Sequence, residues 1–289
     1  VAMREPEAGA GAELARAGGM PVFGAVMPFL LLAQMVVHLK WADPTPVWVV
    51  LAGLALVLLV LASWLGLTWL PLVALGAVAL VQHAWLGVAL PLSLRPWEGC
   101  LWTLVFAAGF TIYPLVAAGA RRLRGAWIAA ALSGIPQFHV AYRIVEEFWP
   151  NRVMGLVPLV FAVPAAVLVW HVARTTPRAE PWRVERLAWA AGAVLFLVTV
   201  ALPIQFDGPV LTIGLALEGG ALLWLMRRVP HPGLLWVGTG LLVTTSARLL
   251  LDPGLLDGAV RGALPFWNEW MATYAVAADR KSTRLNSSH

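Results

Sequence analysis

The sequence has few charged residues. Asp, Glu, Lys and Arg together make up 12% of its 289 residues, whereas 60% are hydrophobic. Soluble domains contain about 25% charged residues, because a polar surface has to cover the globule. A cytosolic enzyme, a disordered chain and a secreted disulfide scaffold are excluded by this composition. The composition predicts a membrane protein.

Cysteine and motifs typical of catalysis are nearly absent. The single cysteine, Cys100, permits no internal disulfide and no thiolate metal cluster. The sequence contains no phosphate-binding loop, nucleophile elbow or dinucleotide-binding fingerprint, and no two histidines have the spacing of a zinc helix. The basic residues are scattered and form no stripe for nucleic acid. We therefore expect no catalytic residue, no cofactor, no metal and no nucleic-acid partner.

Long hydrophobic runs are the main feature that is present. Nine runs are each of a length that lets a helix cross roughly 30 Å of hydrocarbon. Continuous apolar runs of about 20 residues favour helices over barrel strands. The predicted fold is an all-α polytopic transmembrane bundle with about nine complete spans and the start of a tenth. The nine runs are residues 22–39, 46–64, 69–90, 99–119, 125–145, 154–173, 185–203, 210–229 and 233–251, and the tenth begins near Pro265.

Both ends of the sequence differ from its apolar middle. Residues 1–21 form a polar N-terminal stub, residues 22–278 the transmembrane helical domain, and residues 279–289 a wholly polar tail. The tail resembles the translation of a sequencing adaptor, so we expect it to be an artefact. We also expect the chain to be a fragment of a longer protein whose flanking helices are missing.

The distribution of basic residues predicts the orientation in the membrane. If nine spans alternate, the side of Val1, here named side A, receives about eleven Lys and Arg residues, and the opposite side, side B, about six. Cytoplasmic connections are richer in these residues. We therefore expect the N-terminal end to be cytoplasmic and the protein to lie in the inner membrane of a bacterium, with the lipid bilayer as its partner.

Charged residues inside the predicted spans are the candidate functional residues, because a charge at the bilayer centre costs about 2.5–3.5 kcal/mol on insertion scales. Glu218 lies near the middle of the run 210–229. We expect Arg248 of the next span to be its partner. Asp207 is expected at the side B surface, where it either caps the Glu218 helix or lies at the mouth of a cavity.

A second group of polar residues lies in the run 125–145 and just after it. His139, Arg143 and Glu147 recur every four residues and therefore share one face of a helix. This stripe reaches side B. It either lines a polar cavity or marks the end of the helix.

The C-terminal third contains a distinctive pattern. Residues 201–208 read ALPIQFDG and residues 213–225 read IGLALEGGALLWL. With residues 248–252 and 268–274, this pattern resembles the AIPL…DG…WALEGAALLWLG signature of bacterial membrane proteins grouped as domain of unknown function 2339. Leu215 stands where that signature has tryptophan. The resemblance covers residues 185–278 and implies a much longer multi-span protein, but no activity.

Three functions remain open. The first is a transporter or channel-like module in which Glu218, Arg248 and Asp207 line the path of a small solute or ion. The second is a membrane-embedded enzyme that acts on lipid-linked sugar or acyl groups with Asp207, Glu146 and Glu147. The third is a structural or assembly protein of the cell envelope, whose polar residues only hold helices together.

Overall fold

The computed structural model of the chain describes residues 19–39, 43, 45–88, 95–150, 153–206, 208–228 and 232–251. These residues form helices joined by short turns, and no strand occurs among them. The predicted all-α class is therefore confirmed for this part of the chain. The chain divides into two compact units, residues 1–151 with 157–197, and residues 152–156 with 198–289.

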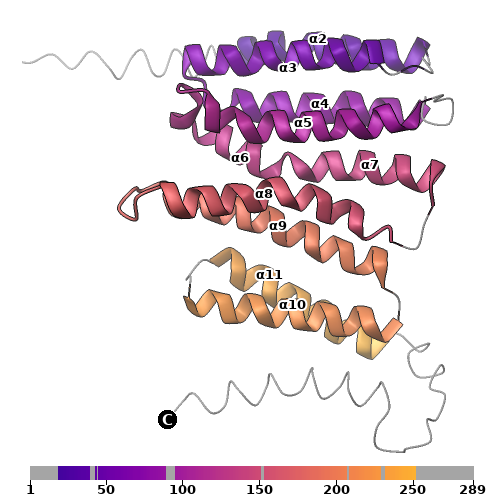
Figure 1. Cartoon of the computed structure of the whole chain (residues 1–289), viewed down its shortest axis with the longest axis vertical. Coiled ribbons are helices and arrows are strands. Elements are labelled where there is room, and N and C mark those ends of the chain that lie inside the picture. Colours follow the sequence, from indigo (N-terminus) through magenta and orange to yellow (C-terminus); the bar gives the residue numbers. More distant parts are fainter. Residues whose placement is uncertain are drawn as a thin grey trace, which may run out of the picture. The chain divides into compact units, whose positions relative to one another are not determined.

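The first unit contains the helices from α2 to α8 and the first part of α9. Helix α2 packs against α3 and α4, while α5 packs against α3, α6 and α7. Successive long helices run in opposite directions, so the α3–α4, α5–α6 and α8–α9 connections lie at one end of the unit (Figure 1). The bounds are α2 Gly19–Leu39, α3 Thr45–Leu65, α4 Leu70–Val88, α5 Pro96–Val116, the 3-10 helix η2 Ala120–Arg122, α6 Arg124–Leu132, α7 Gly134–Phe148, α8 Leu156–Thr175 and α9 Arg183–Gln205.

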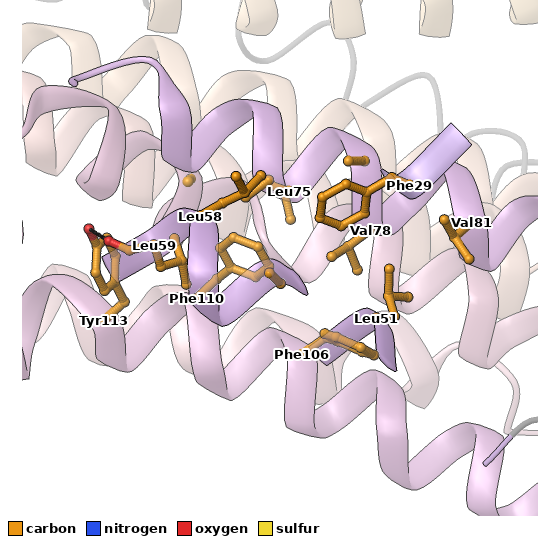
Figure 2. Packing of buried hydrophobic residues seen from close by; sticks show 14 of the residues in the cluster. Phe29, Leu51, Leu58, Leu59, Leu75, Val78, Val81, Phe106, Phe110 and Tyr113 are labelled. Atoms are coloured by element: carbon orange, nitrogen blue, oxygen red, sulfur yellow. Dashed lines mark hydrogen bonds between the residues drawn. The ribbon is translucent and has the colours of Figure 1, made fainter. Parts of the chain in front are cut away.

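Large apolar side chains from α2 to α5 form the core of the first unit. Figure 2 shows Phe106 and Phe110 of α5 near Leu51 of α3 and Val78 of α4, all of them buried. Beside this group, the buried rings of Trp48 and Trp85 meet edge to face, with their centroids 5.5 Å apart. Such aromatic pairs add about 0.5–1.5 kcal/mol to the burial of their area.

Helices of the first unit also carry large apolar side chains on their outer surface. Leu31, Leu56 and Val163 are each more than half exposed. A helix that is hydrophobic on every side is typical of a membrane span, because lipid replaces water around it. The exposed apolar surface therefore agrees with the membrane location that composition predicts.

Within the described part of the chain, five helices are long and apolar enough to cross a membrane: α3, α4, α5, α8 and α9. The predicted count of nine or ten spans is not supported, although the predicted runs coincide with helices to within about three residues. One reason is that two helices offer only shorter apolar stretches among the described residues. These stretches are Gly24–Leu39 in α2 and Leu211–Trp224 in the second unit. The other is that the run 125–145 forms two helices, α6 and α7, rather than one.

Ser133 separates α6 from α7. Its hydroxyl is buried and donates to the carbonyl oxygen of Ala130 at 2.9 Å. Pro136, which follows, has no N–H to continue the helical bonding. At Gly134, an added Cβ would lie 2.5 Å from the carbonyl oxygen of Phe161, so only glycine lets α7 begin this close to α8. The break between α6 and α7 therefore follows from the Ser133 hydroxyl, the missing N–H of Pro136 and the contact of Gly134 with α8.

At the end of the first unit that lies away from the α3–α4 and α5–α6 connections, polar side chains join the starts of α3 and α5. Asp43 accepts a hydrogen bond from the amide of Thr45 at 3.0 Å, and the Thr45 hydroxyl donates to Glu98 at 2.7 Å. Arg95 forms an ion pair with the same Glu98. The hydrogen bonds from Thr45 hold the pKa of Asp43 below its ordinary value, because they stabilise the carboxylate. Asp43 thus acts as a cap for α3.

The second unit contains the end of α9 and two further helices, α10 Gly208–Arg228 and α11 Pro232–Leu251. Helices α10 and α11 pack closely against each other. Added Cβ atoms at Gly219 and at Gly238 would each lie 3.1 Å from the carbonyl oxygen of the other glycine. Small residues at a crossing let two backbones approach, which is a common way for membrane helices to associate.

Several predicted features lie outside the described residues. These are residues 1–18 of the N-terminal stub, the start of the tenth run near Pro265, the tail 279–289, and Asp207.

Candidate functional site

Glu218 lies in the middle of α10, ten residues from Gly208 and ten from Arg228. At 1.5 Å per residue, its position is about 15 Å from either end of the helix. The side chain is partly buried. The hydroxyl of Thr199 on α9 donates a hydrogen bond to Oε1, while Oε2 is buried and has no hydrogen-bond partner among the described residues. Among the described residues, the carboxyl group is therefore hydrogen-bonded at Oε1 and buried without a hydrogen bond at Oε2.

Small residues lie along the helix that carries this carboxyl group. Gly219, the next residue, lies against Gly238 of α11, and Gly214 lies against Leu202 of α9. Thr212 of α10 and Thr245 of α11 are buried. Glycines let apolar helices approach closely, and threonine hydroxyls place polar atoms among them.

The predicted companions of Glu218 are Arg248 and Asp207, and Asp207 lies outside the described residues. Arg248 lies in α11, but its side chain is outside the described part of the structure. The predicted ion pair between Arg248 and Glu218 therefore stays a prediction, as does the role of Asp207. Sequence reasoning missed Thr199. The available signal was that Thr199 is the one hydroxyl residue in the run 185–203.

A second polar group lies in the first unit, between α4 and α7. Gln82 and Gln137 exchange two amide hydrogen bonds, at 2.9 and 2.7 Å, and both side chains are fully buried. Beside them, Nε2 of His83 and Nδ1 of His139 are 3.0 Å apart, and the planes of their rings are parallel within 1°. This arrangement joins two helices through four polar side chains.

The tautomer of His83 follows from its second contact. Nδ1 of His83 lies 2.7 Å from the carbonyl oxygen of Ala79. A carbonyl only accepts, so Nδ1 carries the proton and donates it. In neutral His83, Nε2 then accepts the hydrogen bond from Nδ1–H of His139. The two rings form an ordered chain of hydrogen bonds that ends at Nε2 of His139.

The predicted stripe on α7 is divided between two contacts. His139 meets His83, whereas Arg143 forms an ion pair with Glu146 at 2.6 Å. Glu147 is exposed. The proposal that the three stripe residues line one cavity stays a prediction. His83 was missed as the partner of His139, because 56 residues separate them and no periodic pattern connects two different helices.

No cluster of three or more His, Cys, Asp or Glu side chains suited to a metal ion occurs among the described residues. The two histidines alone provide two nitrogen ligands, and structural zinc requires four.

No family model, no curated protein and no solved structure matches the chain. The resemblance to domain of unknown function 2339 therefore stays a prediction.

Proposed function

We propose that the protein is a transporter or channel-like module of the bacterial inner membrane that carries a proton or another small ion past Glu218. The observation that carries this proposal is the carboxyl group in the middle of α10, with one oxygen bonded to Thr199 and the other buried without a partner among the described residues. An ionisable group at this depth is costly and is a functional candidate by default.

The chemistry of Glu218 suits a small positive species. A buried carboxylate is stable only when it binds a proton, a cation or a hydrogen-bond donor. Thr199 supplies one donor to Oε1 and thereby fixes the orientation of the group. Oε2 is left as the atom that takes up and releases the transported species. The transported species would neutralise Glu218 each time it binds.

The enzyme alternative has weaker support. Glu146, one of its candidate carboxylates, accepts hydrogen bonds from Arg143 and Tyr142 on its own helix. A carboxylate that is engaged by a guanidinium is a poor general base. Transport therefore accounts better for the carboxyl group that the structure leaves half-satisfied.

The test is ion flux into liposomes that contain the purified protein. A potassium gradient with valinomycin sets an inside-negative potential, and internal pyranine reports proton entry. We expect wild-type protein to acidify the lumen faster than protein-free liposomes, and Glu218→Gln to reduce the flux to the protein-free rate. Parallel assays without valinomycin use radioactive sodium and rubidium in place of the pH dye.

Glu147→Gln is the matched control, because it removes an exposed carboxylate at the end of α7. This variant is expected to retain wild-type flux. Equal flux in wild-type and Glu218→Gln liposomes, or no flux of protons, sodium or rubidium above the protein-free rate, would contradict the proposal.

A further inference from the structure

A pocket of about 230 Å³ opens at the end of the first unit that holds the α3–α4, α5–α6 and α8–α9 connections. This is the end that the charge distribution assigns to side A. The volume is smaller than the roughly 300–1,000 Å³ of pockets for drug-sized ligands, so the pocket suits a compact chemical group. Its arginines and tryptophans are Arg122, Arg124, Arg186, Trp127, Trp182 and Trp189.

The charge of the pocket is positive. Glu185 is the acidic residue in its lining, against three arginines. It pairs with Nε of Arg124, which leaves the two terminal nitrogens of that guanidinium as donors. Arg122 forms no ion pair within the part of the chain that the structure describes, and its side chain is exposed. Among the described residues, the pocket therefore offers an anion one guanidinium without an ion pair, that of Arg122, and the terminal N–H donors of Arg124.

Arg186 is fixed more firmly than the other two. It donates to Glu180 at 2.8 Å and to the carbonyl oxygen of Arg121 at 3.1 Å, and only 15% of its side chain is exposed. It therefore forms a rigid wall of the pocket. A ligand that binds here meets preorganised positive charge and does not have to order a flexible side chain.

Tryptophan rings orient these guanidinium groups. Arg124 lies over Trp182 with 5.0 Å to the ring centroid, and Arg186 lies over Trp127 with 4.5 Å. A guanidinium stacked on a ring keeps its N–H edges free for a bidentate anion. Trp182 and Trp189 are also exposed over 49% and 41% of their surface. Exposed tryptophans at helix ends are typical of the lipid headgroup layer.

We propose that this pocket binds a phosphate group, held by Arg122 and Arg124 against the fixed charge of Arg186. Arginine forms paired, charge-assisted hydrogen bonds with phosphate oxygens. Basic pockets between membrane helices on the cytoplasmic side bind anionic headgroups. An anionic phospholipid and a free phosphate share this chemistry. The site lies in the first unit and does not depend on the role of Glu218.

The test is ligand binding to the detergent-solubilised protein, measured by native mass spectrometry and by the shift in thermal unfolding. The probes are phosphatidylglycerol, phosphatidylcholine and inorganic phosphate. We expect phosphatidylglycerol to bind about ten-fold more tightly than phosphatidylcholine, because the choline cation of phosphatidylcholine neutralises its phosphate, whereas phosphatidylglycerol keeps a net negative charge. Arg122→Gln and the double variant Arg122→Gln/Arg124→Gln are each expected to lose this preference.

Arg174→Gln provides the matched control. Arg174 also lies over a tryptophan, Trp170, at 4.9 Å, but it is not in the pocket. This variant is expected to keep wild-type binding. Arg122→Gln is the more informative variant if the double variant unfolds, because Arg124 has a structural ion pair and Arg122 has none among the described residues.

The outcomes distinguish the two sources of phosphate. Tighter binding of phosphatidylglycerol that inorganic phosphate does not displace assigns the pocket to a lipid headgroup. Arginine-dependent binding of inorganic phosphate assigns it to a soluble phosphate group. Phosphate recognition would be overturned if neither probe bound, or if a folded Arg122→Gln protein and the double variant both retained wild-type affinity.

Discussion

Replacing Gly125 with alanine is expected to destabilise the first unit by about 3 kcal/mol, at the upper end of the range for an overpacked site. A Cβ at this position would overlap the carbonyl oxygen of Thr68 and lie 2.9 Å from its carbonyl carbon. Both atoms belong to the backbone of the α3–α4 connection, so no side chain can rotate away. The start of α6 would have to move from this connection.

The sign of this effect is informative, because helix propensity alone predicts the opposite. Alanine is favoured over glycine inside a helix by about 1 kcal/mol. Gly192 of α9 is the matched control, since an added Cβ there meets nothing within 4 Å. We expect Gly192→Ala to unfold at or above the wild-type temperature in detergent, and Gly125→Ala well below it. Equal unfolding temperatures for the two variants would show that α6 does not approach the Thr68 backbone this closely.

The positions of the helices could be predicted from the sequence because a lipid environment leaves an apolar segment few ways to satisfy its backbone. A run of about 20 apolar residues has to satisfy its backbone groups internally, so it forms a helix whatever its neighbours are. The division of the run 125–145 at Ser133 could not be predicted in this way. It depends on Gly134 lying against α8 and on the hydrogen bond of the Ser133 hydroxyl to the carbonyl oxygen of Ala107 on α5, which are tertiary contacts. The number of complete spans predicted from hydropathy is likewise not supported by the described residues.

Single unusual residues could be recognised in the sequence, whereas contacts between helices could not. Glu218 was singled out because a charge in an apolar run is rare. Its donor Thr199 and the pairing of His83 with His139 depend on how helices face each other. The structure also places Trp182 in a pocket with arginines that lie on other helices or connections. Spacing along one helix carries no information about such partners.

Gln137→Leu is expected to destabilise the first unit by about 1–3 kcal/mol, the cost of leaving a buried polar group without its partner. Gln82 and Gln137 are fully buried and bond reciprocally. With leucine at 137, the amide of Gln82 loses both bonds and has no water to replace them. The measurement is thermal unfolding in detergent, supported by denaturant titration. Gln82→Leu should have an effect of similar size.

The double variant Gln82→Leu/Gln137→Leu separates the hydrogen bonds from the packing. Replacing both partners with apolar groups of similar shape is nearly neutral, so we expect the double variant to recover most of the loss. Gln34→Leu, at an exposed position of α2, is the control for the change of residue type alone. If each single variant were as stable as wild type, the amides would not be paired inside the bundle. If the double variant lost as much as the sum of the singles, steric fit at this contact would explain the destabilisation. In that case, the alignment of His83 with His139 would depend on the shape of the glutamine side chains rather than on their mutual hydrogen bonds.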